Sequence, residues 1–383
     1  MREVLQSGIA VMVCAQCAVA TPTPGVSFSL LGDLPGGNFY SSATAISGDG
    51  TTVVGQSIST NGFEAFVWRA ETGMVGIGDL PTGEFSSLAS GVSHDGSVVV
   101  GIGRVLEGPF SAGRAFRWTA GSGMVDLGTV SGTQGSFSNA HAVSAGGQYI
   151  AGTSATPSGF DMFRWDEANG MMSLGGFEGR GVTDDGSVVV GFEAIGGGAF
   201  EAQRWTLETG PVGLGFLSGA AGDSRGNAVS PDGRFIIGSS SSPAAGAGSR
   251  EAFRWTESGG MVGLGSTDPE SGSFFTEALA INMDGSVIVG FEQVVGDDEF
   301  FATIWTQGVG MQRLDSVLAG MGAELFGFTL LQATGISADG LTIVGVAEDR
   351  EGFRQAFIAT IPAPPAAGVL APLAVVAARR RRR

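Results

Sequence analysis

Lysine is absent from this 383-residue sequence, and all 20 of its basic residues are arginines. Cysteine occurs only at Cys14 and Cys17, and histidine only at His94 and His141. A zinc site would need further thiol or imidazole ligands close to the two cysteines, and the two histidines lie far along the chain. We therefore interpret the C-x-x-C spacing as part of an apolar N-terminal stretch and not as a metal or redox pair.

Positive charge is scarce in the central part of the chain. Residues 21 to 361 contain 36 acidic side chains and 14 arginines, which gives a net charge of −22. Such a surface repels nucleic-acid phosphates and anionic lipids, so neither is expected as a ligand of the folded part. Helical periodicity is also scarce, whereas glycine is abundant, with 66 residues. This composition favours one large all-β domain.

One sequence block occurs seven times. Its copies are AISGDGTTVVG, GVSHDGSVVVG, AVSAGGQYIAG, GVTDDGSVVVG, AVSPDGRFIIG, AINMDGSVIVG and GISADGLTIVG. An Asp-Gly pair between two β-branched runs predicts a tight turn between antiparallel strands, because Gly readily adopts the positive φ that such turns need. Each copy therefore predicts two strands of a repeating β unit.

A second block, typified by EAFVW and EAFRW, follows each copy of the first. All six tryptophans end this block, and Ala359 takes their place in the seventh copy: Trp68, Trp118, Trp165, Trp205, Trp255 and Trp305. Alternation along a strand puts Phe66 and Trp68 on one side and Ala65 on the other. We expect each unit to bury a large aromatic side chain against its neighbours.

The two ends of the repeat array complement each other. The seventh copy lacks the closing block found in the others, such as GMVGIG, while SFSLLGDLPGG near the N-terminus matches MVGIGDLPTGE between the first two copies. We predict an all-β fold over residues 27–360, a seven-bladed β-propeller of four-stranded antiparallel blades, closed by an N-terminal strand that completes the last blade. An open β-solenoid is the alternative, because repeats alone do not prove closure.

The termini carry export features. Arg2, an apolar run from Gly8 and the small residues 18–20 predict a signal peptide over residues 1–20. At the other end, the apolar stretch 366–378 precedes five arginines. Thirteen residues span about 20 Å as a helix, less than the roughly 30 Å of a bilayer core, so the stretch predicts a transient membrane contact. A disordered basic tail is the alternative.

The repeats and their spacing resemble the HAF-repeat family of bacterial extracellular proteins over about residues 30 to 359. That family implies export and repetition but no agreed activity. The histidine that names it is replaced here, so no role of that histidine is carried over; the residues at its position include Glu64, Arg114, Asp161, Glu201 and Glu251.

Residues 361–383 resemble a PEP-CTERM sorting signal, with Ala363 in place of the usual Glu. The residues that carry this likeness are Pro362 and Pro364, followed after the apolar stretch by Arg379, Arg380, Arg381, Arg382 and Arg383. The resemblance implies an exosortase-type sorting protease as a partner. It also implies delivery through a transient membrane-anchored form to the exterior, the cell surface or the extracellular matrix.

Carboxylates of the turns are candidate calcium ligands, since calcium prefers oxygen. We favour a structural role for the recurring Asp-Gly aspartates, because the turn alone explains them. Denser acid groups are better candidates for calcium, although a solvated loop explains each of them too: Asp184 with Asp185, and Asp297 with Asp298 and Glu299. No other cofactor is expected.

Arginine also recurs at one repeat position, just before the tryptophan: Arg117, Arg164, Arg204 and Arg254. These side chains would either line a rim with positive charge or pair with neighbouring acids and extend past tryptophan rings, and we favour the second arrangement.

No Ser-His-Asp arrangement is indicated, and His94 and His141 are expected at the surface. The first functional hypothesis is a non-enzymatic binding or scaffold module that recognises an extracellular polysaccharide or surface proteins. The alternative is a secreted carbohydrate-active hydrolase or lyase with two carboxylates on one propeller face. An enzyme should show one pocket that breaks the repetition, whereas a scaffold should show nearly equivalent blades.

Overall fold

The computed structural model describes residues 25–362 except 82–84, 108–109, 218–221, 247, 272–273 and 295–298. The predicted signal peptide over residues 1–20 and the sorting tail beyond Pro362 lie outside this part of the chain. Within it, no helix has both the length and the apolar character needed to cross a membrane.

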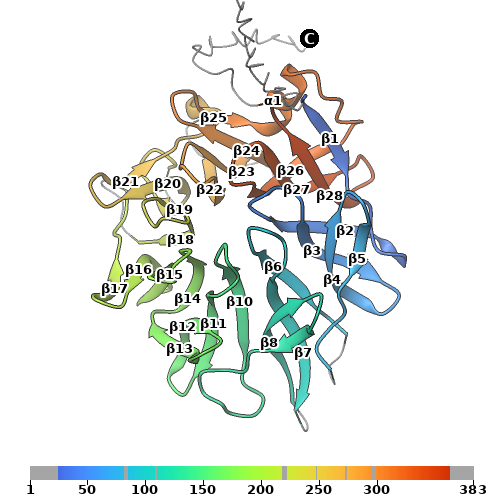
Figure 1. The fold of residues 1–383 in the computed structure, drawn as a ribbon. Helices are drawn as coiled ribbons and strands as arrows, with labels where there is room; N and C mark the ends of the chain where they lie inside the picture. Colours follow the sequence, from blue (N-terminus) through green and yellow to red (C-terminus); the bar gives the residue numbers. More distant parts are fainter. Residues whose placement is uncertain are drawn as a thin grey trace, which may run out of the picture.

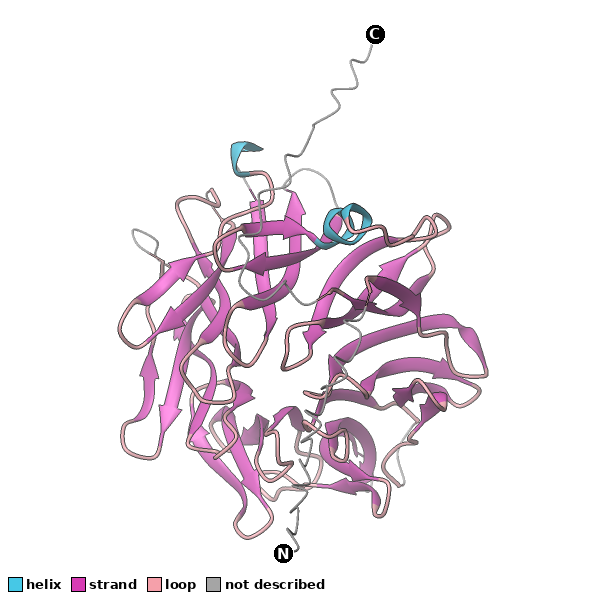
Figure 2. Ribbon diagram, turned by 45° about the horizontal axis from the view of Figure 1, so that its top comes forward, coloured by secondary structure: helices cyan, strands magenta, loops and turns pink. Residues whose placement is uncertain are grey.

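The described residues form seven four-stranded antiparallel sheets, arranged as blades in a ring (Figure 1, Figure 2). The first strands, nearest the centre, are β2 (Gly36–Ile46), β6 (Leu88–Val92), β10 (Ser138–Val143), β14 (Glu178–Val182), β18 (Ser224–Val229), β22 (Phe274–Ile281) and β26 (Thr329–Ile336). The second strands are β3 (Val53–Ser59), β7 (Val99–Glu107), β11 (Ile150–Thr156), β15 (Val188–Gly196), β19 (Ile236–Ser241), β23 (Val287–Val294) and β27 (Thr342–Glu348).

The third strands are β4 (Gly62–Arg69), β8 (Phe110–Thr119), β12 (Gly159–Asp166), β16 (Ala199–Thr206), β20 (Arg250–Thr256), β24 (Phe300–Thr306) and β28 (Arg354–Thr360). The outer strands are β5 (Gly73–Gly76), β9 (Gly123–Asp126), β13 (Gly170–Gly175), β17 (Gly210–Gly213), β21 (Gly260–Gly263), β25 (Gly310–Arg313) and β1 (Ser27–Leu30). We number the blades 1 to 7 in the order of their first strands. A short helix, α1 (Leu314–Gly320), and a 3-10 turn, Pro269–Ser271, lie between blades.

The N-terminal strand closes the ring. β1 pairs antiparallel with β28, and its register runs from Ser27 opposite Thr360 to Leu30 opposite Phe357. Figure 1 shows the blue β1 beside the dark red strands of blade 7. Each first strand also contacts the first strands of both neighbouring blades, and β26 contacts β2. The predicted closed seven-bladed propeller is therefore confirmed, and the open solenoid is excluded.

The hydrophobic core of the described chain consists of seven clusters, one at each contact between adjacent blades. The second repeated block supplies a fully buried phenylalanine in five of the blades: Phe66, Phe116, Phe163, Phe253 and Phe357. The tryptophans are half-buried, except Trp205, which is 6% exposed. Phenylalanine, more than tryptophan, is thus the central aromatic of a blade.

Backbone contacts within a blade explain the glycine that ends each copy of the first block. A Cβ atom at Gly55 would overlap the carbonyl oxygen of Ser42, and one at Gly101 would overlap that of Leu88. The first and second strands approach too closely at this point for any side chain.

Hydroxyl groups on the first strands, or just before them, connect neighbouring blades. The Oγ atom of Ser87 accepts a 2.9 Å hydrogen bond from the backbone N–H of Ala65 and donates a 2.6 Å bond to the carbonyl oxygen of Gly78. The same pair of bonds recurs at four other blade contacts, through Ser41, Ser138, Ser224 and Thr276. These bonds satisfy buried backbone groups where two sheets meet.

Candidate functional site

The turns between first and second strands lie together at one end of the blades, which we call the turn face. In a typical turn, the Asp95 carboxylate accepts hydrogen bonds of 2.9 Å from the backbone N–H of Ser97 and 2.8 Å from the hydroxyl of Ser93. Bonds from the hydroxyl and N–H of Ser97 and from Ser93 lower the pKa of Asp95 to about 2. The structural role predicted for these aspartates is confirmed.

The calcium candidates of blade 4 accept hydrogen bonds from backbone N–H groups and from one hydroxyl. Asp185 accepts from the hydroxyl of Thr183 at 2.8 Å and from the N–H of Ser187 at 2.9 Å, while Asp184 accepts from the N–H of Ala145 at 3.0 Å. Across the described residues, no group of three or more His, Cys, Asp or Glu side chains is placed to hold a metal ion.

The second calcium candidate stays a prediction. Glu299 is exposed between β23 and β24, and its partners Asp297 and Asp298 lie outside the described residues.

The two histidines differ in position. His94 is exposed on the turn face, as expected, and its backbone links three turns: it accepts from the N–H of Asp49 and donates to the carbonyl of Ala145. The expectation for His141 was wrong. It lies on first strand β10 with its side chain 22% exposed and Nε2 3.5 Å from Glu178, because a first strand faces the middle of the ring.

Among the described residues, two of the four repeated arginines have hydrogen-bond or ion-pair partners, Arg164 and Arg254, whereas Arg204, like Arg117, has none. Arg164 donates to the carbonyl of Gly186 at 2.9 Å and lies over the Tyr149 ring, and Arg254 likewise donates to Gly285 at 3.0 Å. The favoured interpretation was that these arginines pair with acids or extend past tryptophan rings. It is confirmed for Arg164, which lies 3.7 Å from Asp166 and over the Trp205 ring, and for Arg254, which lies over the Trp305 ring. Arg117 has no hydrogen-bond or ion-pair partner within the described part of the chain.

Acids at the position of the family's histidine hold the connections between blades. Glu64, Glu201 and Glu251 each accept a hydrogen bond from the N–H of a glycine that follows the outer strand, at 3.0, 3.1 and 2.9 Å. In blade 2 the buried Arg114 takes this position and pairs with Glu107 at 2.6 Å. These side chains have structural partners here.

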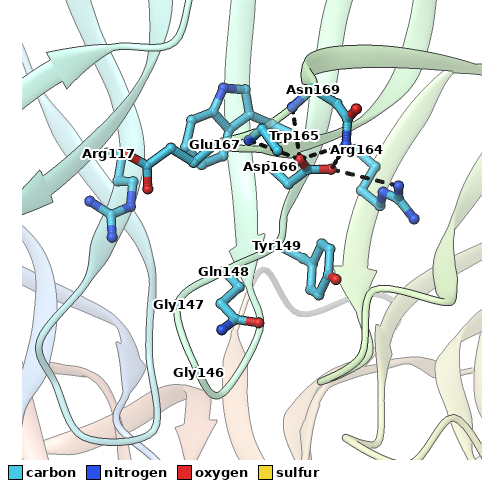
Figure 3. A pocket seen from close by; sticks show the side chains of 11 residues that line it. Arg117, Gly146, Gly147, Gln148, Tyr149, Arg164, Trp165, Asp166, Glu167 and Asn169 are labelled. Carbon is cyan, nitrogen blue, oxygen red and sulfur yellow. Dashed lines mark hydrogen bonds and ion pairs between the residues drawn. The ribbon is translucent and has the colours of Figure 1, made fainter.

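A cavity of about 430 Å³ opens on the turn face at blade 3. Figure 3 shows Arg117 and Glu167 on one side, Tyr149 and Arg164 on the other, and Gln148 between them. The cavity lies where the repetition breaks, because Gly146 takes the position that Asp holds in the other six turns. This is the one carboxylate missing from the series of turns.

The cavity contains two adjacent acids, Asp166 and Glu167. One Asp166 oxygen accepts from the N–H of Ala168 at 3.1 Å and from the N–H and side-chain amide of Asn169, and Arg164 lies 3.7 Å from the other. These bonds tie the Asp166 carboxylate to the turn that follows it. Glu167 is exposed on the rim.

A second break in the repetition lies between blades 5 and 6, and sequence reasoning missed it. Asp223, just before β18, lies 2.6 Å from Arg250 and 3.6 Å from Arg225, and Arg250 lies 3.8 Å from Glu277. Asn227 donates to Glu277 at 2.9 Å. The only signal in the sequence was that these positions change from copy to copy. The two acids and two arginines balance each other in charge across these two blades.

The opposite end of the blades carries the hairpins between second and third strands, and we call it the hairpin face. Exposed phenylalanines recur near these hairpins: Phe63 (45% exposed), Phe110 (55%), Phe160 (41%) and Phe353 (44%). Some meet aromatic rings from the neighbouring blade, as Phe353 meets Phe39 with ring centroids 6.4 Å apart. These four residues lie on blades 7, 1, 2 and 3, which are adjacent in the ring.

No protein-family model and no curated protein matches this chain. Among solved structures, it is similar to an oligogalacturonate lyase in complex with manganese (TM-score 0.53, 10% identity, covering 89% of this chain and 97% of that one). It is also similar to an oligogalacturonate lyase from Vibrio parahaemolyticus (0.52, 11%, 89% and 98%) and to the β-propeller domain of the Trilobed protease from Pyrococcus furiosus (0.51, 12%, 83% and 94%). At these identities the likeness shows the propeller fold alone.

Proposed function

We propose that this chain is an exported, non-enzymatic binding propeller that attaches to extracellular polysaccharide at the cell surface or in the matrix. The observation that carries the proposal is the series of exposed phenylalanines on the hairpin face. A buried aromatic ring would serve the core, but an exposed one offers its π-face to the C–H groups of a sugar ring. Repetition around the ring suits a ligand that is itself a repeating polymer.

The acids of the blade 3 cavity argue against the enzyme alternative. A glycosidase needs one carboxyl group that stays protonated as the acid and a second that acts as base or nucleophile. Asp166 already accepts hydrogen bonds from the N–H groups of Ala168 and Asn169 and from the Asn169 side-chain amide, so its carboxylate has a structural role in this turn. Its neighbour Glu167 is exposed on the rim, so the lining of this cavity offers no second enclosed carboxylate.

Export rests on the sequence features of the two ends. In this proposal a signal peptide over residues 1–20 directs secretion, and Arg379–Arg383 keep the tail on the cytoplasmic side until an exosortase-type protease cuts near Pro362. The described chain reaches Pro362 just after β28, so a cut beyond it would leave every blade complete.

Co-sedimentation with purified surface polysaccharide tests the binding function. A variant with Phe63, Phe110 and Phe353 changed to Ser should lose most of its retention, whereas Val262→Ser, a change at a residue 56% exposed on β21, should keep it. Equal retention of both variants would overturn the polysaccharide surface. The same variants can be sedimented with purified surface proteins. If the phenylalanine variant loses binding to these proteins but not to the polysaccharide, the partner is a protein. Release of a product from the polysaccharide would establish an enzyme.

A further inference from the structure

Six of the seven turns on the turn face contain their own carboxylate. In each of them the carboxylate accepts a hydrogen bond of 2.9 to 3.1 Å from the backbone N–H two residues later: Asp49, Asp95, Asp185, Asp232, Asp284 and Asp339. In five of them it also accepts from a hydroxyl two residues earlier. A carboxylate is thus a regular part of the turn.

Blade 3 keeps the donors of this turn without the acceptor. The backbone N–H of Gln148, which corresponds to the donor in the other six turns, has no acceptor among residues that the structure describes. The hydroxyl of Ser144 accepts from the N–H of Tyr149 at 3.1 Å and has no acceptor of its own there. Ser144 is 1% exposed, so its hydroxyl is not freely hydrated.

The backbone does not require glycine at position 146. A Cβ atom built there would meet only the Cγ atom of Gln148, at 4.0 Å, and the φ of Gly146 lies outside the left-handed region. An aspartate would therefore fit, as it does in the other blades. The missing side chain instead leaves Gly146, Gly147 and Gln148 to line a cavity of about 430 Å³, with the buried Ser144 hydroxyl behind them in the same turn.

We propose that this cavity binds the carboxylate of a uronate, an acidic sugar, at the place where the other turns hold their own aspartate. This inference rests on the proposed polysaccharide binding and names the acidic sugar as its ligand. The ligand's carboxylate accepts from the N–H of Gln148 and the hydroxyl of Ser144. The guanidinium of Arg117, which has no partner among the described residues, supplies the matching charge.

The rest of the cavity suits the sugar ring. Tyr149 and Trp165 provide aromatic surface, and both are half-buried, so part of each ring stays accessible. Asp166 and Glu167 provide acceptors for sugar hydroxyls. The exposed carboxylate of Glu167 opposes the anion, so the affinity depends on Arg117 outweighing it.

The test is titration of the ¹⁵N-labelled full chain with sodium acetate, glucuronate and uncharged glucose, while the amide signal of Gln148 is followed. Acetate has the shape of the missing aspartate side chain, so it should shift this signal saturably. Glucuronate should bind at least about tenfold more tightly than acetate, because it adds ring contacts, and glucose should not saturate at the same concentrations.

Two variants at one position provide the matched control. Gly146→Asp should abolish the shifts with both acids, because the new carboxylate takes the donors, whereas Gly146→Ala should retain them. Arg117→Gln should weaken glucuronate about tenfold, and Glu167→Gln should strengthen it. Binding that survives Gly146→Asp would overturn the site, and glucuronate no tighter than acetate would overturn the sugar class.

The two functional claims fail separately. The hairpin-face variants leave the cavity intact, so loss of the polysaccharide function with intact glucuronate binding would sink only the proposed function. A chain that binds polysaccharide through the hairpin face but does not respond to acetate or glucuronate would sink only this inference.

Discussion

The hydroxyl of Ser41 accepts a 2.9 Å hydrogen bond from the backbone N–H of Ala356, and these residues lie 315 positions apart in the chain. The same hydroxyl donates to the carbonyl of Gly32 at 2.6 Å. One side chain thus connects blade 1 to both strands that meet in blade 7, β28 and the segment after β1. The closure of the ring depends on the contacts at this point.

Removal of that hydroxyl should weaken the closure. Ser41→Ala leaves the N–H of Ala356 and the carbonyl of Gly32 without this partner, and the free energy of unfolding should fall by about 1 to 3 kcal/mol. Ser29→Ala, at an exposed site in β1, should change it by less than about 0.5 kcal/mol. Urea denaturation measures both values. Equal stability of the two variants would show that the closure does not rest on Ser41.

Asp95 should make the fold sensitive to strong acid. Hydrogen bonds from Ser97 and Ser93 lower its pKa from 3.8 to about 2, so the folded state holds the proton less readily than the unfolded chain. Its contribution is complete above pH 3.8 and is lost as the pH falls from there towards about 2. The stability difference between wild type and Asp95→Asn should therefore shrink across this range. Thermal unfolding at several pH values measures it, and a constant difference would contradict the assignment.

His141 should make the stability of the fold depend on pH in a higher range than Asp95 does. Burial, and secondarily the charge of Arg180, lower its pKa from 6.5 to about 3, whereas the charge of Glu178 is matched by Arg180 at 2.7 Å. Below pH 6.5 the unfolded chain binds a proton at His141 and the folded chain does not. The free energy of unfolding therefore decreases as the pH is lowered, by at most about 1.4 kcal/mol per pH unit. Urea unfolding at several pH values between 7 and 5 measures this dependence, and the free energy of unfolding of His141→Gln should change less with pH than that of the wild type. Identical slopes would mean that His141 titrates normally.

The Asp223 carboxylate should stabilise blades 5 and 6 more than an exposed ion pair does. It faces Arg250 at 2.6 Å, and the two side chains are 23% and 17% exposed. Asp223→Asn removes the acid that faces Arg225 and the nearer of the two acids that face Arg250, and should cost about 2 kcal/mol after allowance for solvent screening.

An exposed ion pair offers the comparison for Asp223. Glu348→Gln breaks the pair with Arg354, whose side chain is 54% exposed, and should cost less than about 0.5 kcal/mol. Chemical denaturation in low and high salt distinguishes the two, because salt should reduce the smaller effect further. A loss for Asp223→Asn no larger than that for Glu348→Gln would show that the cluster is not stabilising.

Blade number and closure could be predicted because both follow from repeated segments of the sequence. Seven Gly residues at fixed spacing from the turn gave the count, and the N-terminal strand from Ser27 to Leu30 matched a segment missing from the last copy. The cluster around Asp223 and Glu277 could not be predicted, since its members differ from copy to copy and meet only when consecutive blades stack. His141 was misplaced because its depth depends on the position of β10 on the inner side of its blade, which the local sequence does not reveal.

Alternation along the third strand predicted which side of the sheet each residue faces, but not how deeply its side chain is buried. Ala65 and Phe66 point to opposite faces, yet both are fully buried, because each blade is covered by a neighbour on both faces. Trp68 shares the side of Phe66 but is half-buried. Depth depends on distance from the edge of the blade, which a single repeat does not encode.

The difference in depth between phenylalanine and tryptophan should be visible in blade 2. Phe116 is 0% exposed within the cluster that joins blades 1 and 2, whereas Trp118 only packs against that cluster from its edge. Phe116→Ala should cost about 3 to 5 kcal/mol, because it leaves a cavity that the stacked sheets cannot close. Trp118→Ala removes a larger side chain but should cost less, since solvent reaches the site and fills part of the space. Denaturant unfolding of both variants measures this order, and a larger loss for Trp118→Ala would place the tryptophan, instead of the phenylalanine, at the centre of the blade contact.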